Sequence, residues 1–429
     1  MNKIVQQQVM LSVQQAEIII LNLVQPLRAP ADQERLDLGS AGGRILATDV
    51  CGHLDFPHWD NASMDGYAVR FEDVSVCSPE QPAVLDIVEE VPAGYQPQRF
   101  LQPGEAARIL TGAVMPQGAD TVVIQENTHR QGDRVQVLAA PTPQANVRHR
   151  AAFYQAGTTL LPQGIVLNAP ELAVLATAQC SQVTVYRQPI VAIFSTGSEL
   201  VAPDQALQPG QIVDSNQYAL AALIAQSGAK PHLLGVVPDQ PERLKATITA
   251  AIAQADVVIS SGGVSVGDYD YIDQILAELG ADIAIRAVAV KPGKPLTVAA
   301  FPPMSGFQQK STLYFGLPGN PVSALVSFWR FVQPALRKLT GLSQCWGPVF
   351  VTARSRQNLQ GDGRRETYVW GRLYLVNGIY EFEPASGSHS SGNLINLAQT
   401  NSLAVVPIDQ ALVPVLAEVQ VLQVGPPLP

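Results

Sequence analysis

The chain has 429 residues, more than one hydrophobic core usually serves, so two to four domains are expected. Hydrophobic residues make up 47% and charged residues 15%, a balance that indicates an ordered globular protein and argues against a disordered one. The net charge of −9 argues against a nucleic-acid partner or an anionic membrane surface, because both require an excess of lysine and arginine. Anionic ligands must then be met by local groups of cations.

The four cysteines are far apart and form no Cys-x-x-Cys pair, which argues against a zinc or redox site and fits a reducing compartment. The apolar run from Ile18 to Leu23 is too short to span a bilayer, and no cleavable signal pattern precedes it. We therefore expect a cytoplasmic protein without a membrane segment.

The spacing of apolar residues changes three times along the chain. Residues 9–24 predict a helix, and short β-branched runs with glycine turns follow it and predict a small β domain. Between 189 and 340 buried apolar runs alternate with amphipathic helices, which is typical of a doubly wound parallel sheet. The prediction is an α/β multidomain protein with a helical domain over 1–50 and 150–185, an inserted β domain over 51–149, a doubly wound α/β domain over 186–337, and a C-terminal all-β domain over 338–429.

A glycine-rich run, Ser260-Ser-Gly-Gly-Val-Ser-Val-Gly-Asp268, follows an apolar strand and opens a helix. Glycines let backbone N–H groups point at an anion, and serine hydroxyls add further donors. A tight turn that binds nothing is the alternative. The candidate anion-binding residues are Ser261, Gly262, Gly263, Ser265 and Gly267.

Polar residues follow other strands of the same predicted sheet, where ligands bind in such folds. Glu199 ends a run of small polar residues and is either a ligand or an ordinary exposed side chain, while Asp239 by itself reads as a helix cap. The segment Lys291-Pro-Gly-Lys294 fixes two cations beyond a strand, where they suit phosphate or another oxyanion, or simply solvent. A further strand-to-helix turn, Gly316-Leu-Pro-Gly-Asn-Pro321, carries Pro318, Asn320 and Pro321.

The β region contributes two further candidates. Asp65 lies in a polar, turn-forming segment, and loops of this kind often carry function. Thr111 follows an expected strand, where its hydroxyl either meets a ligand or closes a turn. His53 and His58 flank Asp55 across a proline, and a metal site there is the weaker interpretation.

These motifs together resemble the molybdopterin molybdenumtransferase family, whose eukaryotic relatives include one half of gephyrin. The resemblance implies a molybdopterin-binding α/β domain, a homodimer with a cleft shared between subunits, and a Mg²⁺-dependent reaction. In that reaction molybdate and adenylylated molybdopterin are the substrates and AMP is released. The segments that carry the match are Asp60-Asn-Ala-Ser-Met-Asp-Gly-Tyr-Ala-Val69, Arg108-Ile-Leu-Thr-Gly-Ala113, Phe194-Ser-Thr-Gly-Ser-Glu199, Ser260 to Asp268, Lys291-Pro-Gly-Lys-Pro295 and Gly316 to Pro321.

The resemblance also assigns roles to single residues. Glu199, Asp239 and Asp270 are implied as Mg²⁺ ligands, with Asp268 as the alternative to Asp270. Trp370 stands where a second arginine is usual, which leaves one anionic contact open. The implied catalytic residues are Asp65, Thr111, Glu199, Asp239, Asp270 and Lys291, and the implied cofactor-binding residues include Lys294, Pro318, Asn320, Pro321 and Ser388.

Two other functions remain open from the sequence. A molybdopterin adenylyltransferase shares the α/β domain and its Ser-Gly-Gly loop, but it is expected as a stand-alone domain and as a pathway partner of this protein. A non-enzymatic dimeric scaffold of the same fold would tolerate the loss of the carboxylates Asp65, Glu199 and Asp270. The long N-terminal region and the C-terminal β region favour molybdenum insertion over both.

Overall fold

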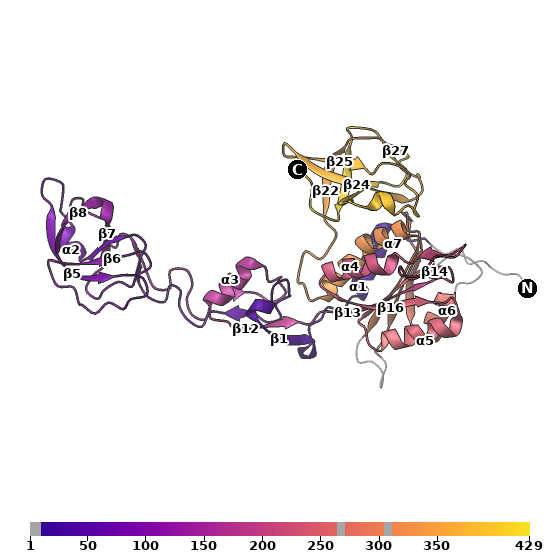
Figure 1. Ribbon diagram of the computed structural model, residues 1–429, viewed down its shortest axis with the longest axis horizontal. Helices are drawn as coiled ribbons and strands as arrows, with labels where there is room; N and C mark the ends of the chain where they lie inside the picture. Colours follow the sequence, from indigo (N-terminus) through magenta and orange to yellow (C-terminus); the bar gives the residue numbers. More distant parts are fainter. Residues whose placement is uncertain (1–9, 264–270, 304–310) are drawn as a thin grey trace, which may run out of the picture. The chain divides into compact units, whose positions relative to one another are not determined.

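The computed structural model describes residues 10–263, 271–303 and 311–429 (Figure 1). The chain divides into two compact units. The core unit comprises Met1–Thr48, Gln163–Asn168 and Gln182–Pro429, and the inserted unit comprises Asp49–Pro162 and Ala169–Ser181. None of the helices in these described parts has both the length and the apolarity to cross a bilayer.

The inserted unit is built on a six-stranded sheet with the order β7-β4-β6-β5-β9-β8. All neighbours are antiparallel except β5 and β6. Both faces of the sheet are buried, because Tyr67 and Val69 lie in one hydrophobic cluster and Ala68 lies in another. The strands are β4 (Gly66–Val69), β5 (Ala83–Val91), β6 (Glu105–Ile109), β7 (Thr121–Ile124), β8 (Thr128–Gln131) and β9 (Arg134–Val137); the smaller elements are β2 (Val50–Cys51), β3 (Asn61–Ala62), α2 (Phe71–Val74), β10 (Val147–Arg148), β11 (Thr159–Leu161) and α3 (Ala169–Thr177).

The core unit centres on a six-stranded sheet with the order β16-β13-β17-β21-β20-β18. The strands β16, β13, β17 and β21 are parallel, so their carboxyl ends lie along one edge of the sheet. The sheet strands are β13 (Ile190–Thr196), β16 (Lys230–Val237), β17 (Val257–Ser261), β18 (Asp282–Ala287), β20 (Pro295–Phe301) and β21 (Thr312–Leu317).

One strand of this sheet departs from the expected all-parallel arrangement. β20 is antiparallel to both of its neighbours, β18 and β21. A parallel connection needs a crossover of a dozen or more residues, and the segment between Ala287 and Pro295 is too short for one. Pro292 in that segment and Pro295, the first residue of β20, conceal the strand in the sequence. As a result, the start of β20 lies at the same edge as the carboxyl ends of the parallel strands.

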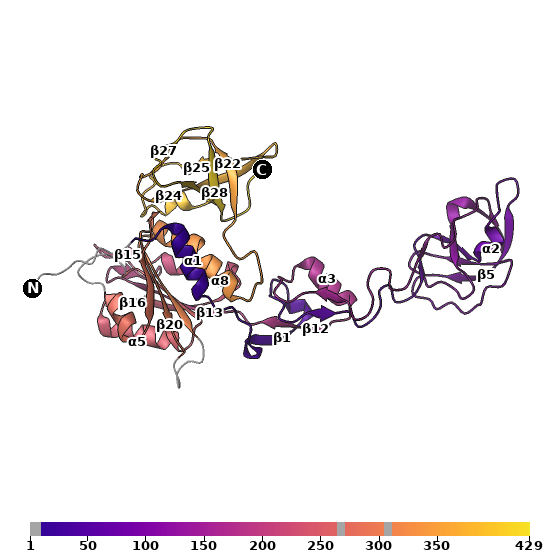
Figure 2. The same cartoon turned by 180° about the vertical axis from the view of Figure 1, so that it is seen from behind.

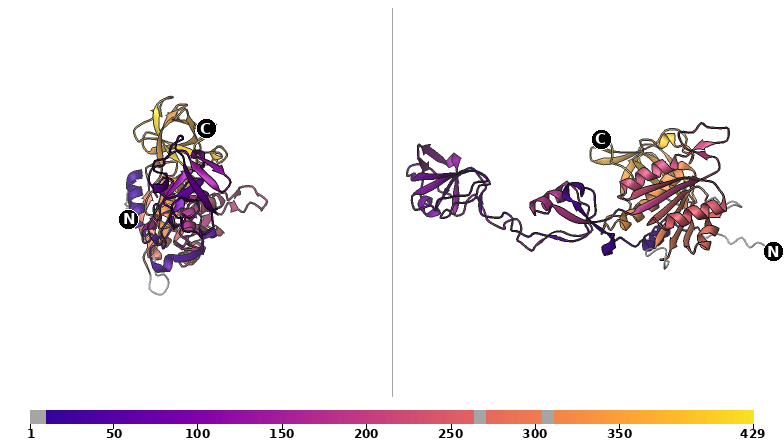
Figure 3. Two further views of the ribbon diagram at one scale, coloured as in Figure 1. Left: turned by 90° about the vertical axis from the view of Figure 1, so that its left-hand side faces the viewer. Right: turned by 60° about the horizontal axis from the view of Figure 1, so that its bottom comes forward.

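Helices cover both faces of the sheet, as the doubly wound prediction requires (Figures 1 and 3). On one face α4 and α7 share a hydrophobic cluster with the strands, and on the other α5 and α6 form a second cluster. The N-terminal helix α1 packs into the first cluster beside α8 (Figure 2). The helices are α1 (Val13–Leu23), α4 (Asn216–Gln226), α5 (Pro241–Ile252), α6 (Tyr271–Glu278), α7 (Pro321–Ser327), the π-helical turn Phe328–Val332 and α8 (Gln333–Leu339).

The C-terminal part of the core unit is barrel-like. Its sheet has the order β19-β24-β25-β22-β28-β26, and β26 also pairs with β24, which closes the sheet. Alternate side chains such as Leu373, Phe382 and Val421 fill the interior. The strands are β19 (Val290–Lys291), β22 (Phe350–Ser355), β24 (Glu366–Val376), β25 (Ile379–Pro384), β26 (Ser402–Val406) and β28 (Glu418–Gln423), with β23 (Leu359–Gln360) paired to β27 (Leu412–Val413).

Two short ladders complete the core unit. β1 (Gln33–Asp37) pairs antiparallel with β12 (Gln182–Tyr186) from the other side of the insertion. β14 (Leu200–Val201) pairs in parallel with β15 (Ile212–Val213) beyond the end of β13. The first ladder joins the two chain segments that lead into and out of the inserted unit.

Candidate active site

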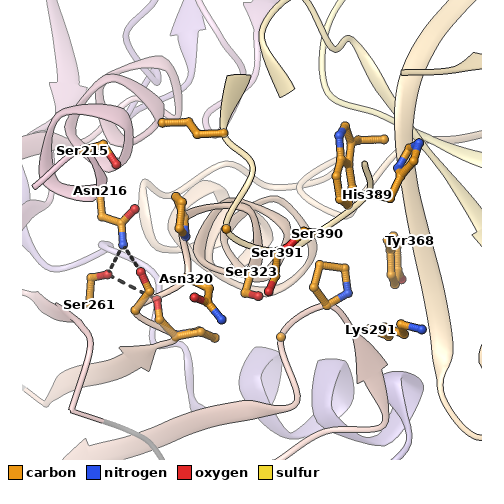
Figure 4. Close-up of a pocket in the computed structure, with 18 of the residues that line it drawn as sticks. Ser215, Asn216, Ser261, Lys291, Asn320, Ser323, Tyr368, His389, Ser390 and Ser391 are labelled. Atoms are coloured by element: carbon orange, nitrogen blue, oxygen red, sulfur yellow. Dashed lines mark hydrogen bonds between the residues drawn. The ribbon is translucent and has the colours of Figure 1, made fainter. Parts of the chain in front are cut away.

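A cavity of about 1410 Å³ lies in the core unit along the carboxyl edge of the central sheet (Figure 4). Its walls come from the segments that follow β13, β16, β17 and β21, from the turn before β20, and from the C-terminal barrel. The sequence-predicted residues that line it are Glu199, Asp239, Ser261, Gly262, Gly263, Lys291, Lys294, Pro318, Asn320 and Pro321.

The glycine turn after β17 brings two strand ends into close contact. Gly262 has a φ of +95°, and a Cβ there would stand 2.3 Å from the carbonyl oxygen of Thr196. Its amide donates to the carbonyl of Leu317 at 3.0 Å, which ties β17 to β21. Only glycine combines this backbone conformation with such a close approach. The turn is therefore fixed by packing between strands, whatever it binds.

Gly262→Ala is expected to lower the free energy of unfolding by about 3 kcal/mol, because positive φ and a backbone clash add together. Gly210 is a matched control, since its φ is +89° and a Cβ there meets nothing within 4 Å. Gly210→Ala should cost only about 1 kcal/mol from backbone strain. Urea unfolding of both variants measures the difference, and equal losses would show that the contact with Thr196 contributes nothing.

Carboxylates stand at the β13 and β16 end of the cavity. The Asp239 carboxylate accepts a short hydrogen bond from the Thr196 hydroxyl, and the Glu199 side chain is exposed. A Cβ on Gly197 would lie 2.9 Å from both carboxylate oxygens of Glu199. The absence of a side chain at Gly197 therefore makes room for this carboxylate. Two hard oxygen donors at one end of a cavity suit a small divalent cation.

Cations stand at the opposite end, beside the start of β20. Lys291 and Lys294 are exposed, and neither ammonium group forms an ion pair with an acidic side chain among the described residues. Arg365 also lines the cavity, and its guanidinium is held by Asp362 at 2.6 Å. Burial opposes ionisation of Asp362, but hydrogen bonds from the Arg364 and Arg365 backbone and the Arg365 side chain lower its pKa. Within the described parts of the chain, no carboxylate competes with an anion for these two lysines.

An aromatic pair occupies the barrel wall where the resemblance implies a second arginine. The Trp370 and His389 rings lie 4.5 Å apart, and the Trp370 indole donates to Asn396 at 3.0 Å. Burial lowers the pKa of His389, although its bond to the Ala385 carbonyl opposes that shift. This wall therefore offers a ring surface and a neutral imidazole in place of a guanidinium.

Several predicted residues stand outside the cavity. Ser388 does not line it, although its neighbours Ser386 and His389 do, and the Ser388 carbonyl accepts bonds from Asn393 and Asn396. No group of three potential metal-ligating side chains occurs among the described residues. The predicted residues Ser265, Gly267 and Asp270, and the alternative Asp268, lie outside the described residues.

Asp65 and Thr111 form a hydrogen-bonded pair within the inserted unit. The Thr111 backbone amide and hydroxyl each donate to the same Asp65 oxygen at 2.7 Å. These two bonds, the backbone one first, lower the pKa of Asp65. The structure thus joins two residues that the sequence reasoning placed on separate segments.

Thr111→Val is expected to raise the pKa of Asp65 towards its ordinary value, because a donor to the carboxylate is lost while the backbone donor remains. Titration of the Asp65 carboxyl carbon by NMR measures this shift. Thr111→Ser keeps the hydroxyl and serves as the control. An unchanged midpoint in the valine variant would mean that the hydroxyl bond does not exist in solution.

Asp214 and Asn216 line the cavity as well, and the sequence reasoning passed over both. The run Val213-Asp-Ser-Asn leads into the first residue of α4 and carries the capping signature of a helix start, and that signal alone could have drawn attention to it. Both side chains are buried beside the glycine turn.

Comparisons with known proteins cover nearly the whole chain. Family models match the MoeA N-terminal region (domain I and II) over residues 11–178, the probable molybdopterin binding domain over 192–338, and the MoeA C-terminal region (domain IV) over 352–424. A molybdopterin molybdenumtransferase from Nostoc sp. is 62% identical over 96% of this chain and 93% of that protein. One from Haemophilus influenzae is 35% identical over 86% of this chain and 88% of that protein.

A solved structure gives the same answer for the fold. The crystal structure of the molybdopterin biosynthesis MoeA protein from Pyrococcus horikoshii OT3 matches with a TM-score of 0.80 and 28% identity, covering 96% of this chain and 100% of that chain. The multidomain fold and the family resemblance are thereby confirmed. With matches this extensive across every part of the sequence, the chain belongs to the molybdopterin molybdenumtransferase family.

Proposed function

We propose that this protein transfers molybdenum from molybdate to adenylylated molybdopterin and releases AMP, as a cytoplasmic enzyme of molybdenum cofactor biosynthesis. The observation that carries the proposal is the order of charges along the carboxyl edge of the sheet. Asp239 and Glu199 follow β16 and β13, while Lys291 and Lys294 stand beside β20. The glycine turn lies between them.

This order suits a substrate that carries several anionic groups. The ammonium groups of Lys291 and Lys294 would bind molybdate or a phosphate, because neither is neutralised by a described carboxylate. The Gly262 N–H already donates to Leu317, so the other backbone N–H groups of the glycine turn would be the neutral donors for a second anionic group. The positioning of two anions by fixed donors is the part of this reaction that the protein supplies.

The carboxylates fit a resident Mg²⁺. Glu199 and Asp239 provide the hard oxygen ligands that Mg²⁺ prefers, and we propose Asp270 as a third. When bound, Mg²⁺ would neutralise charge on the phosphate anhydride. The Thr196 hydroxyl holds the Asp239 carboxylate in place for this role. We also propose Asp65 and Thr111 as catalytic residues and Ser388 as a cofactor-binding residue, because the family resemblance assigns them these roles.

The test is an assay of the purified chain with adenylylated molybdopterin, with and without molybdate and Mg²⁺. AMP is measured by chromatography and bound molybdenum by mass spectrometry. Release of AMP that requires molybdate and yields metal-loaded cofactor supports the proposal. Formation of the adenylylated species from molybdopterin and ATP, without AMP release, would transfer the assignment to the adenylyltransferase step.

We further propose a homodimer that receives its substrate from a molybdopterin adenylyltransferase. The exposed apolar side chains of the inserted unit, including Trp59, Phe100 and Phe153, support an association of subunits. Light scattering of the purified chain measures its mass in solution. A mass of one chain at micromolar concentration would contradict the dimer.

A further inference from the structure

Asn216, the first residue of α4, lies in the wall of the cavity and is 7% exposed. Its amide nitrogen donates to the Ser261 hydroxyl at 2.6 Å and to the Gly319 carbonyl at 2.9 Å (Figure 4). Both N–H hydrogens are therefore used. Its amide oxygen is buried and has no hydrogen-bond partner among the described residues.

The neighbours fix which way this carboxamide is turned. The Gly319 carbonyl can only accept, so the nitrogen and not the oxygen must face it. The Ser261 hydroxyl donates to the Pro318 carbonyl at 3.3 Å and thus presents a lone pair to Asn216. In Figure 4 the oxygen is turned away from these two bonds. An exchange of oxygen and nitrogen would break both of them.

The surrounding polar network is otherwise complete. One oxygen of Asp214 accepts from the Ser195 hydroxyl at 3.0 Å and from the backbone N–H of Asn216 at 3.1 Å, and the other accepts from the side-chain nitrogen of Gln217 at 2.6 Å. The oxygen of Gln217 accepts from the Gly235 amide at 3.0 Å. One unmatched acceptor in a satisfied buried network is unusual and calls for a ligand donor.

The chemistry of the neighbouring residues limits which kinds of ligand can bind at the Asn216 oxygen. Phosphate and molybdate are excluded at this point, because the Asn216 oxygen and the Asp214 carboxylate would both repel an anion. A bound metal ion is not indicated either, because no group of three potential metal-ligating side chains occurs among the described residues and both Asp214 oxygens already accept hydrogen bonds. The group that fits is a neutral hydrogen-bond donor, and the rings of the proposed substrate carry such donors as N–H groups.

We infer that the Asn216 amide oxygen accepts a hydrogen bond from a ring-edge N–H of the substrate, and that it selects heteroaromatic rings that carry such a donor. This inference rests on the proposed function for the identity of the substrate. Adenylylated molybdopterin carries two rings of this chemistry, the adenine amine and the amino-amide edge of the pterin. Both place an N–H on the rim of a planar ring, and Asn216 is a specificity residue for one of them.

The experiment compares ligand pairs by calorimetry on the full-length wild-type protein. One pair is AMP and purine riboside 5′-monophosphate, which lacks the exocyclic amine. The second pair is pterin and a pterin with a dimethylated 2-amino group and a methyl group on N3, which lacks these ring-edge donors. The wild type should bind the donor-bearing member of one pair about tenfold more tightly, the value of one hydrogen bond to a buried acceptor. The pair that shows the preference identifies the ring.

Asn216→Leu should abolish this preference, because it removes the acceptor while keeping the volume. Asn358→Leu is the matched control: Asn358 lines the same cavity, but its amide oxygen already accepts from the Val415 backbone at 2.8 Å, so the preference should persist. A wild type that binds both members of each pair equally overturns the inference. So does an Asn216→Leu variant that discriminates as the wild type does.

The outcome is separable from that of the proposed function. A protein that prefers the donor-bearing ring but releases no AMP with molybdate supports the role of Asn216 and contradicts molybdenum transfer. A protein that releases AMP without any ring preference supports the transfer and overturns the role of Asn216.

Discussion

Lys291→Ala is expected to lower kcat/KM for molybdate-dependent AMP release by about a hundredfold, the usual effect of removing one fixed charge at a reacting anion. The Lys291 ammonium is exposed in the cavity, so its loss should remove a contact to the anion, and it breaks no ion pair within the described residues. Steady-state kinetics with saturating Mg²⁺ and varied molybdate give the value.

Lys230 provides the control for this effect. It is also exposed and belongs to the same sheet, but it begins β16 and so lies at the amino ends of the parallel strands, away from the cavity. Lys230→Ala should leave kcat/KM within about twofold, since surface substitutions rarely matter. Both variants should keep the thermal midpoint of the wild type. A Lys291→Ala enzyme with normal activity would show that the anion is bound elsewhere.

Arg330→Met is expected to lower the free energy of unfolding of the core unit by about 3 kcal/mol, the usual cost of breaking a buried ion pair. Arg330 is 5% exposed and donates to Glu17 of α1 at 2.8 Å and to the Tyr368 hydroxyl of β24 at 3.0 Å. Burial opposes its charge, but the bonds to Glu17 and Tyr368 raise the pKa of Arg330. Burial also raises the pKa of Tyr368, whose hydroxyl donates to Glu366 at 2.5 Å.

The measurement is urea unfolding followed by tryptophan fluorescence, because Trp329 and Trp370 are buried in the core unit. Lys245→Met is the control. Lys245 pairs with Glu278 at a similar 2.9 Å, but both side chains are more than 40% exposed, so about 0.5 kcal/mol is expected. A double variant, Glu17→Met with Arg330→Met, should recover part of the loss, because no charge is left unpaired. Equal losses for Arg330 and Lys245 would contradict the buried network.

Much of the site was predictable because it depends on local sequence. Small polar residues directly after an apolar run indicate the carboxyl end of a strand. The carboxyl ends of parallel strands lie along one edge of the sheet. This reasoning places Glu199, Ser261 and Lys291 at one edge of the sheet, and all three line the cavity there. The antiparallel strand β20 was missed, since its flanking prolines indicated a loop.

The remainder of the site depends on contacts between distant segments, which local patterns do not encode. The Trp370 and His389 pair becomes part of the cavity only because the barrel closes through the β24 and β26 ladder. Asn216 acquires its unmatched oxygen only because Ser261 and Gly319 both take its nitrogen. Burial and hydrogen-bond satisfaction are properties of the packed chain, so the sequence can mark Trp370 as unusual and Asn216 as part of a helix start without indicating the contacts that each of them makes.

The β1 and β12 ladder constrains the order in which the chain can fold. Gln33–Asp37 can pair with Gln182–Tyr186 only when the ends of the long chain segment between them come together. The entropic cost of closing this loop grows with the length of the unstructured chain in it. The inserted unit has its own hydrophobic clusters, so it can become compact first and shorten the effective loop. Contacts of such wide sequence separation slow folding, because the entropy of loop closure is lost before the contact is gained. The rate at which the β1 and β12 ladder forms should therefore depend on how fast the inserted unit folds, although the ladder contains no strand of that unit.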